Sequence, residues 1–396
     1  MKNKLFRNAL AIALAMGTAG TVFAQEIKLS SPGANSGVEI NGYFDLYYQA
    51  SPQGHAVVPV TSAGPDVLEG RSFDRHVNQM TLNMAEISFK KKQGKVLFRA
   101  DLAAGELVDQ LSGGGSQSVT GGGAGQNPTN TAANESTRNL TQATVTYLAT
   151  DRLSVTAGKF YTHVGLEGAK AKDNYQYSRS YTYNYGTPFW HEGLSGSYAI
   201  VPEKASAAIY LLDAWDGRVS QKQNKSTTVG VNLNYSGSEG VVANYNYIGG
   251  AESADQSRRE VHEFNLTYNL NSKIIFAADY IYGTQKKIPL IGDTKWNGLA
   301  LYMKAVVASF YSISPRYEIF DDSDNGFAIA GGLSTIGTKQ KMTALTLANN
   351  FDLGDGLEAR AELRYDKSDS NIFFKNKDGS SIDHQESYTT ALLYTF

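Results

Sequence analysis

The chain has 396 residues, 24 tyrosines, 39 glycines, no cysteine and a formal net charge of −2. The lack of cysteine excludes a disulfide scaffold, a lipid-modified cysteine anchor and cysteine metal sites. The near-neutral charge, without a basic stripe, argues against nucleic-acid binding. Beyond residue 24 no run of eighteen apolar residues occurs, which excludes transmembrane helices.

The N-terminus has the pattern of a signal peptide. Three basic residues precede an apolar run over 9–16, and a stretch of small residues follows. Val22 and Ala24 occupy the −3 and −1 positions of a cleavage site. The apolar run is too short to span a bilayer as a helix. We therefore predict a cleaved signal peptide over 1–24 and a single mature domain over 25–396.

Two-residue alternation is the main structural signal in the rest of the chain. From Leu357 to Tyr365 apolar residues hold the odd positions, while charged residues hold the even positions from Glu358 to Asp366. Similar patterns predict strands near 37–50, 78–92, 94–104, 139–149, 152–162, 191–201, 204–214, 226–236, 239–249, 259–271, 273–283, 294–304, 306–320, 338–352, 355–367 and 385–396.

The connections decide between an outer-membrane barrel and a soluble all-β domain. Links after even-numbered strands are tight turns such as Gln93, Asp151 and Gly354, whereas links after odd-numbered strands are long. Bacterial barrels place short turns in the periplasm and long loops outside. The sequence thus predicts an all-β protein, a transmembrane antiparallel up-and-down β-barrel of about 16 strands, embedded in outer-membrane lipids. A missed pair would make the number fourteen or eighteen.

Aromatic residues agree with this prediction. Tyrosines gather at predicted strand ends, as expected of the aromatic girdles of a barrel. The last strand closes with Tyr394 and Phe396. A terminal phenylalanine is similar to the signal read by the barrel assembly machinery of the outer membrane. The alternative is an ordinary hydrophobic strand end.

Several segments resemble the β-barrel porin-2, or OmpL-like, family. They are GKFYTHVGLE from Gly158, NYQYSRSYTY from Asn174, WNGLALY from Trp296, PRYEIFD from Pro315 and ELRYD from Glu362. The resemblance covers most of the mature chain, and His163 stands where relatives more often have proline. It implies a passive aqueous channel for small polar solutes, without naming the solute. A homotrimer follows by analogy with other porins.

The segment 163–190 lies where porins of this size fold a loop inward to narrow the channel. We interpret it as a constriction that sorts solutes by size and charge. The alternative is an external loop whose tyrosines pack on one another. The candidate constriction residues are Lys170, Lys172, Asp173, Tyr177, Arg179 and Tyr181.

Charged residues of both signs also occupy the predicted inner face of the strands. Opposing charges would create a transverse field in the lumen, and their mixed signs argue against strong ion selectivity. Each residue has an alternative role in a salt-bridge ladder that holds the strands in register. The candidate wall residues are Arg99, Asp101, Arg316, Glu318, Glu358, Arg360, Glu362 and Arg364.

Two further segments have distinctive composition. Residues 105–138 include a Gly, Ser, Thr and Asn stretch that we interpret as a mobile surface loop. Asp321, Asp322 and Asp324 offer the oxygen ligands that calcium prefers, but the glutamate that closes an EF-hand loop is missing. A solvated turn is the better interpretation, and we expect no cofactor or metal.

Three other functions are alternatives to a channel. Catalysis would need a serine beside a histidine such as His262, and no serine has an obvious partner position. A plugged barrel whose surface loops act as adhesin or receptor is the main alternative. A transporter with a plug domain and twenty-two strands would need a longer chain. We therefore predict a porin without enzymatic activity.

Overall fold

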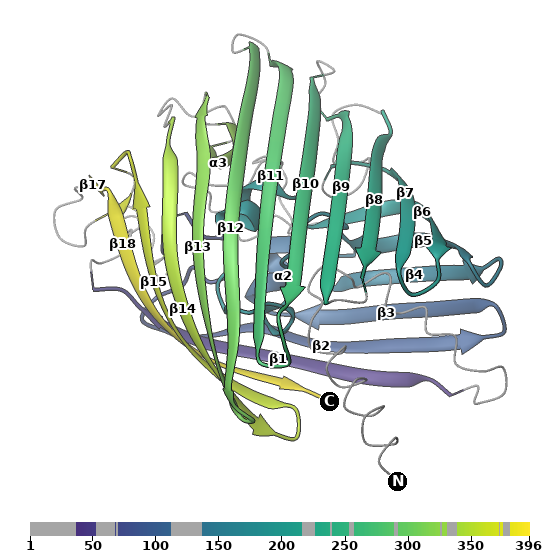
Figure 1. Ribbon diagram of the computed structural model, residues 1–396, viewed down its shortest axis with the longest axis horizontal. Coiled ribbons are helices and arrows are strands. Elements are labelled where there is room, and N and C mark those ends of the chain that lie inside the picture. Colours follow the sequence, from purple (N-terminus) through teal and green to yellow (C-terminus); the bar gives the residue numbers. More distant parts are fainter. Residues whose placement is uncertain are drawn as a thin grey trace.

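The computed structural model describes residues 37–52, 68, 70–111, 137–215, 226–237, 240–252, 257–288, 292–324, 327–330, 339–371, 373–374 and 381–396. Sixteen of the described strands form one closed barrel in which every neighbouring pair is antiparallel (Figure 1). The predicted fold class is thus confirmed. The predicted signal peptide, 1–24, lies outside the described residues.

Each predicted strand is present in the barrel. The main differences lie at the predicted strands 273–283, 294–304 and 306–320. The first two run on to Ile288 and Ala308, and the third covers Tyr311–Asp324. The barrel strands are β1 (Glu39–Ala50), β2 (Met80–Gln93), β3 (Val96–Ala104), β4 (Leu140–Leu148), β5 (Leu153–Tyr161), β6 (Trp190–Val201), β7 (Ala205–Leu212), β8 (Thr228–Ser236), β9 (Val241–Ala251), β10 (Arg258–Asn269), β11 (Ile274–Ile288), β12 (Gly292–Ala308), β13 (Tyr311–Asp324), β14 (Lys341–Gly354), β15 (Leu357–Ser368) and β18 (His384–Thr395).

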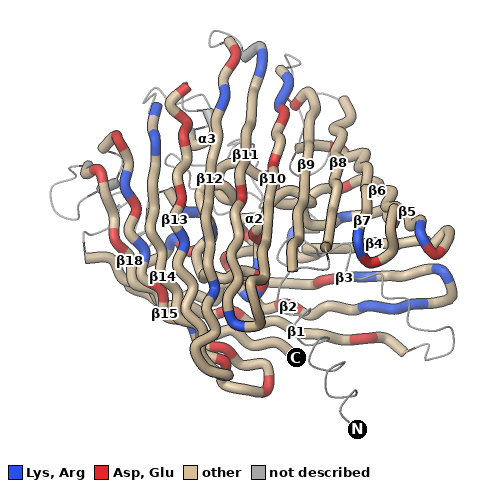
Figure 2. Tube along the Cα trace, in the orientation of Figure 1, with Lys and Arg blue, Asp and Glu red and all other residues tan. Residues whose placement is uncertain are grey.

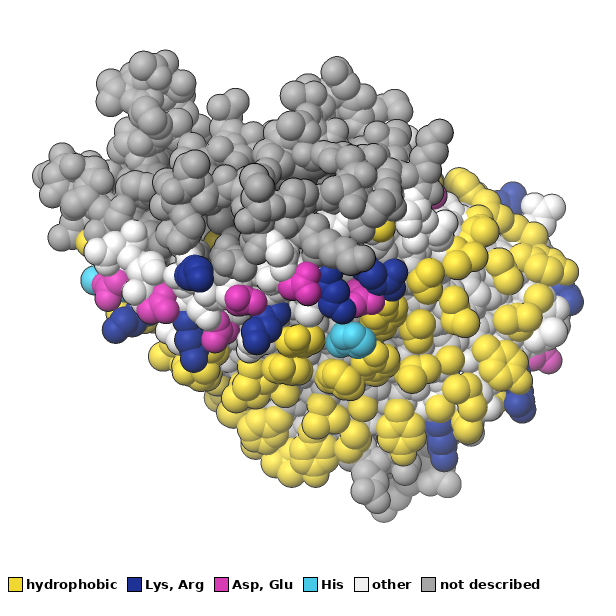
Figure 3. Space-filling view, turned by 90° about the horizontal axis from the view of Figure 1, so that it is seen from above, with side chains coloured by type: hydrophobic (Ala, Val, Ile, Leu, Met, Phe, Trp, Pro, Cys, Tyr) yellow, Lys and Arg dark blue, Asp and Glu magenta, His cyan; other side chains and the backbone are white. Residues whose placement is uncertain are grey.

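The strands have an apolar outer face and a polar inner face. On β10, Phe264 is 53% exposed and Leu266 is 47% exposed, whereas Glu263 is fully buried. Figure 3 shows the outer face as a broad belt of hydrophobic side chains, bordered on one side by a band of charged residues. In a soluble sandwich the apolar face would be covered by a second sheet. Here it faces outward around the barrel, as a lipid-facing surface requires.

The first and last strands close the barrel. Residues Tyr43 to Ala50 of β1 pair with Tyr388 to Thr395 of β18. Gly42 donates its backbone N–H to the carbonyl oxygen of Phe396 at 3.0 Å, and the phenyl ring covers this glycine. A Cβ at position 42 would lie 2.0 Å from the ring, so a larger residue there would have to displace the Phe396 side chain. The start of β1, the end of β18 and tight turns such as the one between β2 and β3 share one end of the barrel, here called the turn end (Figure 1).

The remaining described elements are short. They are α2 (Glu106–Leu111), the 3-10 turn η2 (Ala171–Asp173), the π-helical turn η3 (Thr182–Gly186), α3 (Phe327–Ala330) and a small hairpin of β16 (Phe373–Phe374) and β17 (Ser381–Ile382). None of these helices is long and apolar enough to cross a membrane. The prediction of a mobile loop over 105–138 falls largely on residues outside the described part, although α2 occupies its beginning with Leu107 and Val108 buried.

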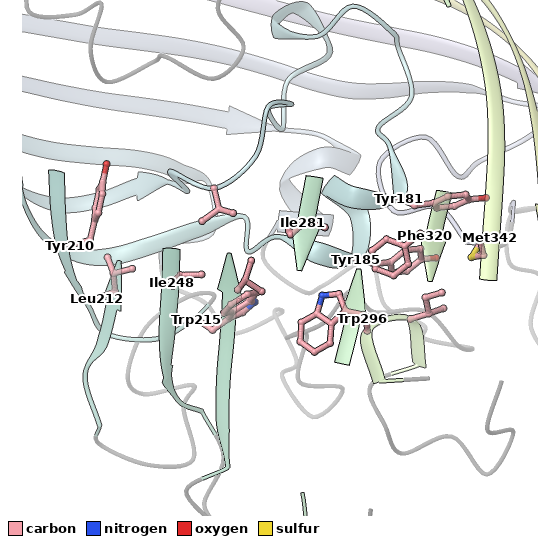
Figure 4. Packing of buried hydrophobic residues seen from close by; sticks show 14 of the residues in the cluster. Tyr181, Tyr185, Tyr210, Leu212, Trp215, Ile248, Ile281, Trp296, Phe320 and Met342 are labelled. Carbon is pink, nitrogen blue, oxygen red and sulfur yellow. The ribbon is translucent and has the colours of Figure 1, made fainter. Parts of the chain in front are cut away.

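Buried side chains fill much of the barrel interior. Tyr181 and Tyr185 of the segment between β5 and β6 pack with strand residues such as Trp296 and Phe320 (Figure 4). A second cluster joins Tyr177 and Tyr183 to the inner faces of β1 and β2. The segment between β5 and β6 therefore crosses the lumen.

Candidate functional site: the inward loop and the lumen walls

Residues 163–190, here called the inward loop, enter the barrel after β5. Gly165 makes the first turn with a φ of +117°, and its backbone N–H donates to Glu263 of β10 at 3.1 Å. Gly298 of β12 makes room for the loop, because a Cβ there would lie 2.7 Å from the Thr182 methyl group. Two glycines thus allow the close approach of loop and wall that the tyrosine-rich sequence alone would obstruct.

Charged residues of β13 and β15 hold the loop on one side. Arg316 pairs with Glu167 at 2.8 Å and donates to the carbonyl oxygen of Ser178 at 2.7 Å. Glu362 accepts the backbone N–H groups of Tyr177 and Ser178 at 2.7 and 3.2 Å. These side chains are buried, so they bind loop backbone and one another instead of facing water.

The same network continues through two more residues of this wall. Glu318 accepts the backbone N–H of Tyr181 and lies 3.2 Å from Arg316 and 3.3 Å from Arg364. Arg364 also donates to the carbonyl oxygen of Arg179 at 2.6 Å. The charges of β13 and β15 therefore form one connected structure with the loop backbone. We call the inner faces of β13 and β15 the charged wall.

The opposite side of the loop rests on β1 to β3. Asp45 of β1 accepts the Tyr177 hydroxyl at 2.8 Å and the Asn83 amide at 2.8 Å. Lys170 forms an ion pair with Glu86 of β2 and lies 4.0 Å from Asp101 of β3. Because the loop is bonded to strands on both sides, it is held as a bridge across the lumen.

A second inward segment, residues 70–77 between β1 and β2, supports this bridge and was not identified from the sequence. Arg71 pairs with Asp74 and with Asp366 of β15, both at 2.8 Å. Phe73 packs edge-on against Phe189 with ring centroids 5.0 Å apart. The only sequence feature that could have indicated this inward segment is Arg71, two residues before Phe73, in a long connection between strands.

The inner face of β4 to β9 is different, and its turn-end half is here called the neutral wall. Its polar side chains are hydroxyls and amides, of which Asn232 and Asn234 stay partly exposed inside the barrel while Asn244 and Asn246 are buried. Asn232 donates to Asn246 at 2.7 Å and Asn234 donates to Asn244 at 2.6 Å. Further along, the Thr146 and Thr156 hydroxyls are hydrogen-bonded at 2.8 Å. Figure 2 shows few charged positions on β7, β8 and β9.

Burial sets the protonation states of two side chains in the inward loop, His163 and Tyr181. Burial lowers the pKa of His163 to about 4, so this ring is neutral at neutral pH. Its Nε2 is hydrogen-bonded to the carbonyl oxygen of Tyr247 at 3.0 Å, and its ring stacks on Tyr210 with centroids 4.0 Å apart. Burial also raises the pKa of Tyr181, which keeps the hydroxyl protonated as a donor to Asp366 at 2.6 Å.

The structure places the predicted constriction and wall residues in two environments. Lys172, Asp173, Arg99 and Glu358 remain exposed or partly exposed. The buried ones are Asp101, Lys170, Tyr177, Arg179, Tyr181, Arg316, Glu318, Arg360, Glu362 and Arg364. Lys172, Asp173, Glu358 and Arg360 meet at one cavity of about 340 Å³ on the turn-end side of the loop.

The residues considered for catalysis and metal binding have ordinary partners. His262 points outward and its Nδ1 is hydrogen-bonded to the Tyr245 hydroxyl at 2.8 Å. Asp321 accepts from Ser323, and Asp322 accepts the backbone N–H of Ile329 at 2.8 Å. Within the described part of the chain, no group of three or more His, Cys, Asp or Glu side chains is arranged to hold a metal ion.

Solved structures share this fold. The anion-selective porin from Comamonas acidovorans matches with a TM-score of 0.57 and 11% identity, covering 91% of this chain and 100% of that porin. The outer membrane channel DcaP of Acinetobacter baumannii matches with a TM-score of 0.57 and 9% identity, covering 93% and 100%. OmpF of Salmonella typhi, in complex with daunomycin, has a TM-score of 0.51 and 13% identity, covering 91% and 97%.

The family comparison is independent of these structures. No curated protein matches the chain by sequence. The family described as "Putative beta-barrel porin-2, OmpL-like" matches residues 37–396, which is nearly the whole chain and all of the barrel. The chain therefore belongs to the OmpL-like β-barrel porin-2 family, as an outer-membrane barrel that forms a passive channel.

Proposed function

We propose that the inward loop sets the size limit of this channel and that small hydrophilic solutes pass the neutral wall. The observation that carries the proposal is the division of the lumen. The charged wall is largely buried under the loop, whereas Asn232 and Asn234 of the neutral wall stay partly exposed inside the barrel. A solute that passes along the neutral wall therefore meets hydrogen-bonding groups that carry no charge.

Such a wall favours hydrophilic solutes in general over ions of one sign. Asn and Thr side chains donate and accept hydrogen bonds, so they can replace part of the hydration of a sugar or a similar polar molecule. They provide no long-range field that would concentrate anions or cations. We infer weak ion selectivity, with the size limit set by the loop between β1–β3 and β13–β15.

Single-channel recording in planar bilayers tests this proposal. We expect stable conductance steps, a permeability ratio for K⁺ and Cl⁻ close to one, and entry of neutral sugars in a liposome swelling assay up to a sharp size limit. Silent bilayers from correctly folded protein would contradict the open channel and would favour a plugged barrel whose surface loops bind a partner.

We also propose that the chain assembles as a homotrimer and that Tyr394 and Phe396 are read by the barrel assembly machinery. A trimeric form of OmpT of Vibrio cholerae shares the fold, at a TM-score of 0.53. The rings of Tyr394 and Phe396 lie on the outer face with centroids 5.8 Å apart, where a membrane partner can reach them. Cross-linking in native membranes tests the trimer. Phe396 deletion should lower the amount of assembled barrel.

A further inference from the structure

Hydrogen-bonded amides connect the neutral wall with Glu263, a buried carboxylate on the inner face of β10. Asn232 of β8 donates to Asn246 of β9 at 2.7 Å, and Asn246 donates in turn to Oε2 of Glu263. Each of these residues lies directly opposite the next in the strand register. They form one continuous chain across three strands, here called the short chain.

A second chain, here called the long chain, runs beside the first. Asn234 of β8 donates to Asn244 of β9 at 2.6 Å, and Asn244 donates to Asn265 of β10 at 2.7 Å. Asn265 donates to Oε1 of the same Glu263 at 2.7 Å. Both chains thus begin at a partly exposed asparagine of the neutral wall and end on one buried carboxylate.

The carboxylate determines the direction of both chains. A carboxylate only accepts hydrogen bonds, so Asn246 and Asn265 must turn their amide nitrogens toward Glu263. Their carbonyl oxygens then face the next asparagine, which must donate as well, and the same holds to the end of each chain. The backbone N–H of Gly165 is a further donor to this carboxylate, at 3.1 Å. Each asparagine side chain therefore has one favoured orientation instead of two.

The chains leave two carbonyl oxygens for the lumen. Asn232 and Asn234 donate to the next strand, and among the described residues none donates to the Oδ1 atom of either. Polarisation along a hydrogen-bonded chain that ends on an anion strengthens these oxygens as acceptors and weakens the remaining N–H groups as donors. The two residues are two positions apart on one strand, which places them about 7 Å apart on the same face. The neutral wall therefore presents two oriented acceptors.

We propose that Glu263 is a positioning residue that makes Asn232 and Asn234 hydrogen-bond acceptors, so that the neutral wall favours polyols, which are solutes with several hydroxyl donors. This inference rests on the proposed channel and deepens it by naming a solute class. A sugar or sugar alcohol can donate to both oxygens at once, because its hydroxyl groups are spread along the molecule. A solute that only accepts hydrogen bonds gains less from the same wall.

Liposome swelling with matched sugars tests this preference for donors. Glucose and a deoxyfluoroglucose have nearly the same size, but in the second sugar fluorine replaces one hydroxyl group and cannot donate. We expect the wild type to admit glucose about two- to threefold faster, because one net hydrogen bond is lost with the fluorinated sugar. Glu263→Gln should bring the two rates close together, because a glutamine amide both donates and accepts and no longer fixes the direction of the chains.

Asn246→Leu separates the orientation of the amides from the charge of the carboxylate. It interrupts the short chain but keeps Glu263 and its bond to Gly165, so Asn232 can reverse its amide group. The long chain stays intact. We expect a preference for glucose between those of the wild type and of Glu263→Gln. If Glu263→Gln does not fold, Asn246→Leu decides alone.

Glu260→Gln is the matched control. Glu260 lies on the same strand as Glu263 but on its outer face, where it pairs with Arg258 and Lys286. Its loss should leave the ratio of the two rates as in the wild type. Equal rates for the two sugars in the wild type would overturn the proposal, and so would a wild-type ratio in Asn246→Leu.

Saturation-transfer NMR on the folded barrel in detergent separates this inference from the proposed function. If neither sugar enters the liposomes, the channel proposal fails, and stronger saturation transfer to glucose than to the deoxyfluoroglucose, lost in Glu263→Gln, would still support the oriented acceptors. Equal transfer to both sugars would overturn them. If both sugars enter at equal rates, the channel stands and the inference about Glu263 fails.

Discussion

The two sides of the lumen differ in their side-chain chemistry and in their role. On the charged wall, Arg316, Glu318 and Arg364 are buried and bind the inward loop. On the neutral wall, Asn232 and Asn234 are hydrogen-bonded to the next strand and still reach water. The charges of β13 and β15 therefore hold the constriction in place, whereas the neutral wall offers uncharged groups to a solute.

The difference follows from the energetics of burial. A buried ion pair is well satisfied only while both partners remain, and removing one leaves an unpaired charge at low dielectric. The charged wall thus fixes the loop in one position. An amide ladder loses less when one member is removed, because water can replace the missing partner. The neutral wall should therefore tolerate substitution better.

The largest expected effect is the loss of one charge from the charged wall. Arg316→Ala leaves Glu167 without its cation and Glu318 with Arg364 alone, and we expect a loss of about 3–5 kcal/mol in the free energy of unfolding. Released from this contact, the loop should also give noisier and larger conductance steps. Urea unfolding in lipid vesicles measures the first effect, and bilayer recording measures the second.

Asn232→Ala on the neutral wall is the comparison for Arg316→Ala. It removes one hydrogen bond to Asn246 at a site that water reaches, so we expect a loss of only about 1 kcal/mol and unchanged current noise. Equal losses for the two variants would show that the charged wall does not hold the loop.

The next effect depends on pH and on the place where the loop begins. His163 contacts Tyr210 of β7 and the carbonyl oxygen of Tyr247 of β9, and its pKa is lowered to about 4 by burial. The unfolded chain takes up this proton near pH 6.5 and the folded chain only near pH 4. The free energy of unfolding should therefore fall as the pH drops through this window, by about 3 kcal/mol at most, and level off below it.

His163→Asn removes this titration. Its unfolding free energy, measured from pH 7.5 to 3.5, should decline less steeply than that of the wild type between pH 6.5 and 4. The charged wall contributes equally to both proteins, so the difference between the two profiles isolates the histidine. Parallel profiles would mean that His163 is not buried as a neutral ring.

A steric change at the loop should have a smaller effect. Gly298→Val places a side chain where Thr182 now lies, and overpacking of this kind costs about 1–3 kcal/mol. We expect η3 to move and the size limit in liposome swelling to change. Gly196→Val on β6 is the control, because nothing lies within 4 Å of a Cβ there and its size limit should stay the same.

The sequence predicted the barrel well because every strand carries its own two-residue pattern. Leu363 and Tyr365 face outward while Arg364 and Asp366 face inward, as the alternation indicates. The alternation predicts only which face of the sheet each residue lies on, however. It does not distinguish an inward residue that meets water from one covered by a loop that arrives from elsewhere in the chain.

For that reason the sequence predicts that the charged residues of β13 and β15 line the pore. They are buried because the inward loop packs on them, and this tertiary contact cannot be inferred from the alternation within a strand. Arg71 and Asp366 are paired although they lie far apart in the sequence.

The smallest effect tests whether the neutral wall decides ion preference. Asn234→Asp places a carboxylate on its accessible inner face, and Asn234→Lys places an ammonium group there. One charge close to a passing ion in watery surroundings is worth about 1 kcal/mol, which corresponds to a change of about fivefold in relative permeability. The reversal potential in a KCl gradient should shift toward cation preference for Asn234→Asp and toward anion preference for Asn234→Lys. Asn297→Asp, which adds the same charge to the outer face of β12, should leave the reversal potential unchanged. Opposite shifts from the two Asn234 variants would place the ion path along β4 to β9, whereas two unchanged potentials would mean that solutes cross elsewhere and that the neutral wall is only structural.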